Sequence, residues 1–302
     1  MRGRRVGWLL AMLAVIAVMA AAGCASSERS GTESASVESS PVRAEVVSSI
    51  PNVQKVTFHS DALDKDMKFN IYFPPGYATT EKYPVLYIYH GYGGNEDSWT
   101  RVLGIDKVAD EWIAQGKIEP LIIVTPQIDV SYGFNSEQFG NYGDYIVQDV
   151  IRYVDGNFST AADRENRYIG GLSMGGWAAL HHAFTHPELF SKAGGHSPAV
   201  WMDDWMDTGG LKNWIYPTEE VRKQRDPYYL ADTADLSEMS VYLDSGDQDY
   251  YKFYQGAEAL DAKLRSRNVR SEYRLNPGGH DEAYWTAHLG DYLLFYSGST
   301  GQ

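Results

Sequence analysis

The feature that most constrains the fold of this chain is a repeated alternation between short apolar runs and longer segments with helical spacing. "YPVLYIYHG" and "PLIIVTP" are continuous apolar runs, as expected of strands buried on both faces of a sheet. In "YIVQDVIRYVDGNF", Val147, Val150, Ile151 and Val154 recur at the spacing of one helix face. This alternation predicts an α/β fold with a mostly parallel central sheet and helices on both of its faces.

The same alternation continues along the chain. Further strands are predicted in "VQKVTFHS", "MKFNIYFPPGY", "RYIGGLS", "FSKAGGHS", "EMSVYLDSG" and "VRSEYRLNPGG", and helices in "IDKVADEWIAQG", "MGGWAALHHAF", "YQGAEALDAKLRSRN" and "AYWTAHLGDYLLFYS". The first two strands are expected to form an edge hairpin. Two stretches, near 127–143 and 198–235, interrupt the pattern and predict excursions from the sheet. A single catalytic domain is expected over residues 51–298.

The first 50 residues have a different composition. Residues 1–23 join a basic start, "MRGRR", to an apolar run of about 15 residues, and the run ends at "AAGC", whose last residue is Cys24. This resembles a bacterial lipoprotein signal with Cys24 as the lipidated residue; the alternative is an ordinary secretory signal cleaved nearby. Residues 24–50 are rich in Ser and predict a disordered tether. We therefore expect an exported protein, lipid-anchored to the cell envelope outside the cytoplasm.

Charge and cysteine content exclude several classes of partner. The 302 residues carry a net charge of −14, which argues against a nucleic-acid partner and against direct adhesion to anionic lipid. Cys24 is the only cysteine, so no intramolecular disulfide can form. No Cys/His cluster has zinc-site spacing, and the best metal candidate is the acidic cluster of Asp203, Asp204 and Asp207. We expect neither a metal nor a cofactor.

The stretch "YIGGLSMGGW" contains the pattern G-x-S-x-G, formed by Gly171, Ser173 and Gly175. Alone this pattern is weak, because chance gives about 0.2 such matches in a chain of this composition. Its context is stronger, because a predicted strand precedes Ser173 and a predicted helix follows it. That is the strand–turn–helix arrangement of a nucleophile elbow. Ser173 is the candidate nucleophile, and the Met174 N–H is a candidate oxyanion donor.

A serine nucleophile needs a base and an acid, which follow it along the chain in this fold class. His280, in "NPGGHDEAYW", lies at a Gly-rich turn after the last predicted strand and is the candidate base. Asp249, in "DSGDQD", follows a late strand and is the candidate acid. Asp244 and Asp247 compete with it for that role.

The second oxyanion donor is expected after an early central strand, where "HGYGG" places the Tyr92 N–H. Together, "YIYHGYGGNEDSW", "GGLSMGGWAAL", "DSGDQD" and "GGHDEAYW" resemble the "Putative esterase" family of α/β hydrolases. That family includes feruloyl esterases, S-formylglutathione hydrolases, enterochelin esterases and the antigen 85 mycolyltransferases. The resemblance implies the α/β-hydrolase fold and the same nucleophile, acid, base and oxyanion donors. One departure is His196, near a position that the family usually fills with small residues.

The resemblance implies a serine carboxylic ester hydrolase that works through an acyl-enzyme. Carbohydrate-linked esters, feruloyl or acetyl, are the favoured substrates, and the export signal argues against a cytosolic formylglutathione hydrolase. An acyltransferase of the mycolyltransferase type and a catalytically silent binding lipoprotein on the same scaffold are the alternatives. Within the two excursions, Tyr132, Trp201, Trp205 and Trp214 are candidate substrate contacts that could stack on a sugar or an aryl acid; their alternative role is to anchor long loops by packing.

Overall fold

The structure is a computed structural model that describes residues 52–202 and 210–299. The predictions for residues 1–50, including lipidation of Cys24, lie outside the described residues, and so does Trp205. Among the described helices, none has both the length and the apolar character that crossing a membrane requires.

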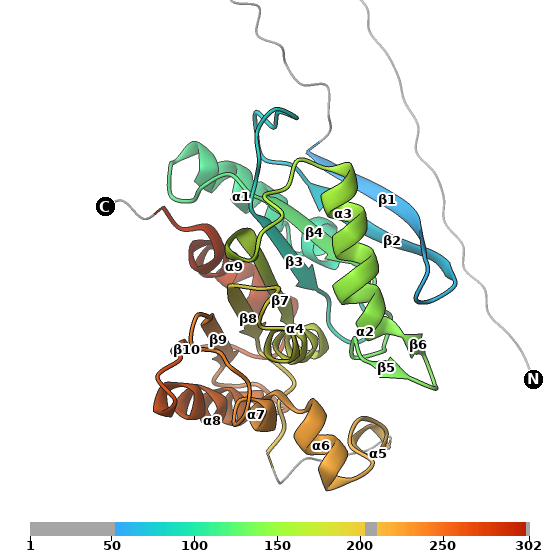
Figure 1. Cartoon of the computed structure of the whole chain (residues 1–302). Coiled ribbons are helices and arrows are strands. Elements are labelled where there is room, and N and C mark those ends of the chain that lie inside the picture. The colour runs from blue at the N-terminus through green and yellow to red at the C-terminus, as the bar shows by residue number, and fades with distance from the viewer. Residues whose placement is uncertain (1–51, 203–209, 300–302) are drawn as a thin grey trace, which may run out of the picture. The chain divides into compact units, whose positions relative to one another are not determined.

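An eight-stranded sheet forms the centre of the described domain (Figure 1). In space the strands follow the order β1–β2–β4–β3–β7–β8–β9–β10. The β1–β2 and β2–β4 pairs are antiparallel, and the other pairs are parallel. The predicted α/β-hydrolase sheet, with an antiparallel hairpin at one edge, is therefore confirmed. The strands of this sheet are β1 Val53–Ser60, β2 Lys65–Tyr72, β3 Val85–Tyr89, β4 Ile122–Pro126, β7 Arg167–Leu172, β8 Lys192–His196, β9 Ser240–Gly246 and β10 Arg270–Asn276.

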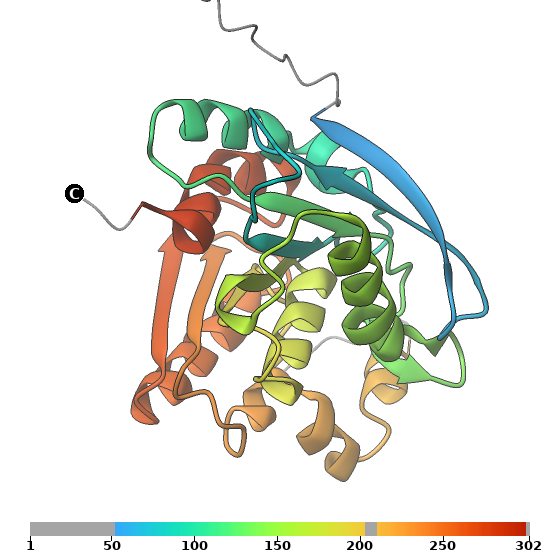
Figure 2. The ribbon, with the colours of Figure 1, turned by 45° about the horizontal axis from the view of Figure 1, so that its top comes forward.

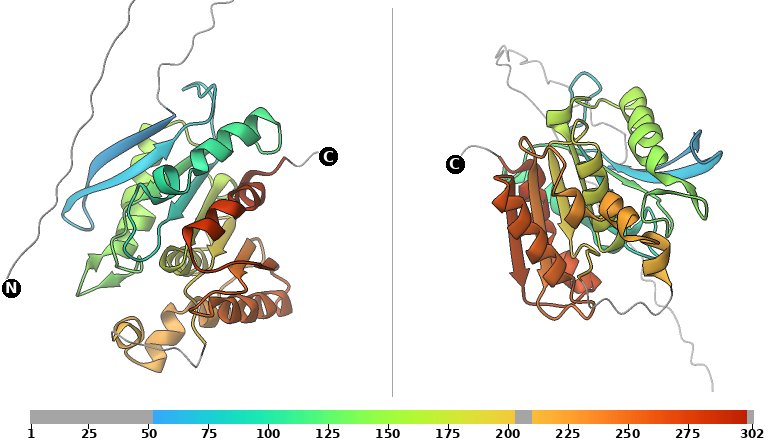
Figure 3. Two further views of the ribbon diagram at one scale, coloured as in Figure 1. Left: turned by 180° about the vertical axis from the view of Figure 1, so that it is seen from behind. Right: turned by 60° about the horizontal axis from the view of Figure 1, so that its bottom comes forward.

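Helices cover both faces of the sheet. The longer ones are α1 Ile105–Ala114, α3 Ile151–Asn157, α4 Met174–Thr185, α8 Phe253–Ser266 and α9 Glu282–Ser297. Figure 2 shows α3 and α4 together on one face, and Figure 3 shows α1 and α9 on the other. Along β3, Tyr87 packs into the cluster with α4 while Leu86 and Ile88 pack into the cluster with α9. The central strands are continuously apolar because both of their faces are buried.

The two predicted excursions form small elements beside α4. The first contains a two-stranded ribbon, β5 Asn135–Ser136 and β6 Gly140–Asn141, followed by the turns α2 Tyr142–Asp144 and η2 Tyr145–Val150. The second contains α5 Leu211–Ile215, α6 Glu219–Arg225 and α7 Pro227–Leu230. Both excursions bond to α4: His182 Nε2 lies 2.7 Å from the Gly133 carbonyl, and His181 Nδ1 lies 2.8 Å from the Arg225 carbonyl.

The parallel strands bring their following loops to one edge of the sheet. β3 leads through a loop into η1 Ser98–Val102, and β7 leads directly into α4. The loops after β9 and β10 lie further along the same edge. A remaining short helix, η3 Arg164–Asn166, precedes β7 at the opposite edge. In open parallel sheets the carboxyl edge is where ligands bind, so the site is sought there.

Candidate active site

Ser173 occupies the sharp turn between β7 and α4. Its φ of +54° and ψ of −118° lie in a region that residues other than glycine rarely adopt. Such a conformation costs about 1–3 kcal/mol and persists only where the surroundings enforce it. A Cβ on Gly171 would lie 2.3 Å from the Gly175 carbonyl oxygen, and one on Gly175 would lie 2.3 Å from that of Tyr89. The close approach of these backbones explains the glycines on both sides of the serine.

The structure brings the three residues Ser173, His280 and Asp249 together. His280 Nε2 lies 2.9 Å from Ser173 Oγ, and His280 Nδ1 lies 2.9 Å from Asp249 Oδ2. Asp249 is buried, and its second oxygen accepts the Tyr251 N–H at 2.7 Å. With the proton of the neutral imidazole on Nδ1 facing the carboxylate, the Nε2 lone pair faces the serine hydroxyl. This geometry suits a general base acting on a serine nucleophile.

The two competing carboxylates contact other groups. Asp244 is fully buried on β9 and accepts hydrogen bonds from Tyr284 Oη at 2.7 Å and Tyr292 Oη at 3.0 Å. Its other oxygen lies 2.9 Å from Nδ1 of His196. Asp247 accepts the Gly278 N–H at 3.1 Å, which ties it to the loop that precedes His280.

His196, where the sequence departs from the family that it resembles, lies beneath the turn at Ser173. Its side chain is fully buried and stacks on Tyr292 with 3.6 Å between ring centroids. Its backbone carbonyl accepts the Ser173 N–H at 2.9 Å. A Cβ on Gly194 would lie 1.8 Å from the hydroxyl oxygen of Tyr296, which itself lies 3.2 Å from His196 Nε2. The imidazole therefore belongs to a buried polar cluster that supports the turn from inside the core.

The loop after β3 passes directly over Ser173. A Cβ on Gly91 would lie 2.7 Å from the Leu172 side chain and 3.5 Å from Ser173 Cβ. The N–H groups of Tyr92 and Met174 donate to no acceptor among the described residues. Met174 opens α4, so its N–H has no partner within the helix. Both groups remain available to an oxyanion formed at the serine.

His90 supports this loop from below. It is buried, and its Nε2 accepts the Ile128 N–H at 3.1 Å. The Nδ1 proton is then donated to the Gly91 carbonyl at 2.8 Å. Burial lowers the pKa of His90, which favours this neutral form. The imidazole thus fixes the beginning of the loop against the segment after β4.

A cavity of about 1130 Å³ opens above Ser173 and His280. Its aromatic lining consists of Tyr92, Tyr132, Phe139, Trp201, Trp214, Tyr250, Tyr251, Phe253 and Trp285. Tyr132 and Trp201 line the cavity but are themselves mostly buried, with their ring centroids 5.9 Å apart. Both roles considered for these residues are thus compatible with their placement, and their contact with substrate stays a prediction. The candidate metal cluster of Asp203, Asp204 and Asp207 lies outside the described residues, and among the described ones no cluster of His, Cys, Asp or Glu has the form of a metal site.

Three aromatic rings that the sequence interpretation missed surround His280. Tyr251, Phe253 and Trp285 each meet the imidazole near perpendicularly, with centroids 5.0–5.2 Å away. They shield its hydrogen bonds from water, which strengthens them. A signal was present in the sequence, because Tyr251 and Phe253 closely follow Asp249 and Trp285 closes the motif "GGHDEAYW".

The chain is similar in sequence to a known protein family and to individual curated proteins. The family model described as "Putative esterase" matches residues 60–296. A curated relative, the "Endo-1,4-beta-xylanase/feruloyl esterase" of Xylanibacter ruminicola, is 36% identical over 179 residues. The aligned region covers 55% of this chain but 24% of the relative, so this chain spans about a quarter of that protein's length.

Solved structures resemble the described domain over most of its length. A ferulic acid esterase superimposes with a TM-score of 0.72 and 23% identity, covering 81% of this chain and 97% of the other. The S-formylglutathione hydrolase of Staphylococcus aureus gives a TM-score of 0.67 with 25% identity, covering 81% and 98%. At 23% identity the first of these likenesses establishes a shared fold.

Proposed function

Because this chain belongs to the "Putative esterase" family, we propose that it is a serine carboxylic ester hydrolase working through an acyl-enzyme. One observation carries the proposal. The 2.9 Å contacts from Ser173 Oγ to His280 and from His280 to Asp249 lie at the wall of a large cavity. A nucleophile, a base and an orienting carboxylate in this geometry are what acyl transfer requires.

In the proposed reaction, His280 takes the Ser173 proton as Oγ attacks the ester carbonyl carbon. The carbonyl oxygen becomes an oxyanion that accepts hydrogen bonds from the Tyr92 and Met174 N–H groups. Asp249 holds the imidazole tautomer and stabilises the imidazolium. When the oxyanion collapses, the alcohol leaves with the proton from His280. Water then attacks the acyl-enzyme by the same route and releases the acid.

For the substrate, we propose a carbohydrate-linked ester with an aromatic acyl group such as feruloyl, rather than acetyl. The aromatic lining of the cavity supports this choice, because flat rings pack well against aromatic side chains. A volume of about 1130 Å³ leaves room for an aromatic acyl group beside a sugar. The feruloyl esterase activity named for the Xylanibacter ruminicola relative points the same way.

The direct test is Ser173→Ala measured against an aryl acetate. We expect hydrolysis to fall by more than about 10³-fold while the fold, read by circular dichroism, is unchanged. A fluorophosphonate should label the wild type and leave Ser173→Ala unlabelled. Ser237→Ala, at an exposed turn, serves as the matched control and should behave as wild type. Retained hydrolysis in Ser173→Ala would overturn the assignment.

A second experiment separates ester hydrolysis from the two alternatives, acyl transfer and binding without catalysis. A panel of feruloyl and acetyl sugars, supplied with a sugar acceptor, is analysed for free acid and for transferred acyl group. Transfer in preference to hydrolysis would replace the proposal by an acyltransferase of the mycolyltransferase type. A wild-type protein that takes no label and cleaves no ester would instead be a binding protein on this scaffold.

We also propose that the protein is exported and lipid-anchored through Cys24. The sequence pattern of residues 1–24 supports this. Expressed in a bacterial host, the full chain should partition with the membrane fraction and incorporate labelled fatty acid, and Cys24→Ser should do neither. Equal partitioning of the two proteins would contradict the anchor.

A further inference from the structure

The loop of residues 90–97, which carries the candidate oxyanion donor, is fixed at its ends rather than along its length. His90 anchors its beginning to the Ile128 N–H. At its tip, Tyr92 is 63% exposed, and Gly93 has a φ of +77° with open space around it. A tip with so few contacts takes its position from the two ends, so the contacts at Glu96 and beyond matter for the Tyr92 N–H.

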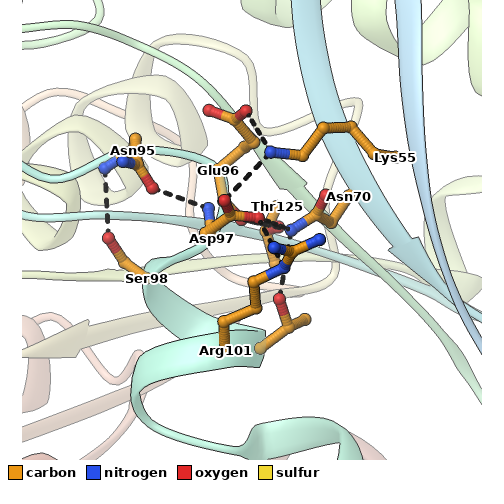
Figure 4. A network of polar contacts seen from close by, with 9 residues as sticks. Lys55, Asn70, Asn95, Glu96, Asp97, Ser98, Arg101 and Thr125 are labelled. Carbon is orange, nitrogen blue, oxygen red and sulfur yellow. Dashed lines mark hydrogen bonds and ion pairs between the residues drawn. The ribbon is translucent and has the colours of Figure 1, made fainter.

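The far end of the loop is bonded to the sheet (Figure 4). The Glu96 carbonyl accepts two hydrogen bonds, from Asn70 Nδ2 at 3.0 Å and from Thr125 Oγ1 at 2.7 Å. Asn70 lies on β2 and Thr125 on β4, and both are buried. Both acceptor sites of one carbonyl are thus occupied by donors on rigid strands.

Lys55, on the edge strand β1, pairs with the two carboxylates at this end. Its Nζ lies 2.7 Å from Glu96 Oε1 and 2.9 Å from Asp97 Oδ2, as Figure 4 shows. The hydrogen bond to Glu96 is the main reason that the pKa of Lys55 is raised, and burial opposes it. Asp97 also accepts from Asn70 at 2.8 Å and lies 3.3 Å from Arg101.

Glu96 differs from Asp97 in that its carboxylate has no second partner in the part of the chain that the structure describes. Its side chain is only 9% exposed, and among the described residues Lys55 is the group that its carboxylate contacts. A carboxylate withdrawn from water without a cation is strongly disfavoured. Removal of the Lys55 charge would therefore drive Glu96 outward to water, away from the bonds that Asn70 and Thr125 make to its carbonyl.

Such a movement of Glu96 would displace the Tyr92 N–H, because short hydrogen-bonded turns connect the two residues. The Asp97 N–H donates to Asn95 Oδ1 at 2.9 Å, and the Gly94 N–H donates to the Gly91 carbonyl at 3.0 Å. A Cβ on Gly94 would lie 2.8 Å from Ser98 Oγ, so the middle of the loop packs closely against the start of η1. Glu96 is four residues from Tyr92, and the segment between them is compact.

We propose that Lys55 is a positioning residue for ester hydrolysis. By neutralising Glu96 and Asp97, it holds the loop of residues 90–97 in the position from which the Tyr92 N–H donates to the oxyanion. This rests on the proposed function. The positioning acts on the transition state, because the oxyanion exists only there and in the tetrahedral intermediate. A misplacement of about 1 Å at a catalytic group can cost about 10²-fold in rate, so loosening one anchor of two should cost about 10-fold.

The first test is Lys55→Met, which removes the charge and keeps the aliphatic stem. With active sites titrated by a fluorophosphonate, we expect kcat on an aryl acetate to fall about 10-fold and KM to change less than about twofold. Lys55→Arg, which keeps the charge, should recover kcat to within about threefold of wild type. Lys263→Met breaks a 2.8 Å ion pair with Asp232 on surfaces that do not line the cavity, and it should leave kcat unchanged.

The second test compares an oxoester with the matching thionoester, in which sulfur replaces the carbonyl oxygen. Wild type should favour the oxoester, because N–H donors bind an oxyanion better than a thiolate-like sulfur. Lys55→Met should lower that preference about 10-fold, whereas a merely structural defect lowers both rates equally. An unchanged ratio, or the same change in Lys263→Met, would overturn the positioning role. A wild-type protein inactive on both esters would overturn the proposed function, and this inference with it.

Discussion

Three carboxylates follow one another at the end of β9, and each contacts a different part of the molecule. Asp244 joins the buried cluster at His196, Asp247 accepts from Gly278, and Asp249 contacts His280. The backbone decides among them. A Cβ on Gly246 would lie 2.3 Å from the Gly278 carbonyl oxygen, so the two loops run in contact. Asp249, three residues after Gly246, is thereby placed beside the imidazole of His280.

At Asp249, replacement by Asn should lower kcat on an aryl acetate by about 10³–10⁴-fold. An amide neither holds the imidazole in the required tautomer nor stabilises an imidazolium. Asp247→Asn is the matched control, because its remaining carbonyl oxygen can still accept from Gly278; kcat should change less than about threefold. Steady-state kinetics after active-site titration measure both. Comparable losses in the two variants would remove Asp249 from the role of acid.

Among the elements, α4 joins Ser173, the proposed nucleophile, to both excursions. It is buried around almost its whole circumference, so polar groups within it need partners. His181 stacks on Trp177 with 5.1 Å between ring centroids and bonds to the Arg225 carbonyl. Burial lowers the pKa of His181 to about 4, and it also lowers the pKa of His182. The excursions are therefore held to α4 by imidazoles that are neutral in the folded protein.

The neutral, buried His181 predicts that the folded protein loses stability as the pH falls. Between pH about 6.5 and about 4, the unfolded chain binds a proton at residue 181 and the folded chain does not. The free energy of unfolding should then fall as pH drops through this window, by up to about 3 kcal/mol from this group. Denaturant unfolding from pH 7 to 4 measures the slope.

Two variants isolate the contribution of His181. His181→Gln has no group that titrates in this range, so its slope should be shallower than that of wild type. His59→Gln changes an exposed histidine, whose side chain is 55% accessible, and should keep the wild-type slope. A His181→Gln protein with the wild-type slope would contradict the prediction.

On the scale of the whole molecule, the sheet and the order of its site residues could be predicted from sequence. Both follow from local patterns, namely buried runs bounded by glycine and motifs at strand ends. The spatial order of the strands could not be predicted, because it depends on long-range pairing. The same holds for the contact of Lys55 with Glu96, which joins the edge strand β1 to the loop after β3, 41 residues further along the chain. No local pattern distinguishes this lysine from any other on an edge strand.

The distance along the chain between the parts of the site has a consequence for biosynthesis. The contact between Ser173 and His280 spans 107 residues, and the loop that carries His280 follows β10, which pairs only with β9 at the edge of the sheet. A chain emerging from the ribosome completes the turn at Ser173, the proposed nucleophile, long before it contains His280, the proposed base. With these roles, catalytic competence requires the last strand and helix, and a nascent chain should be unable to cleave esters that it meets during synthesis.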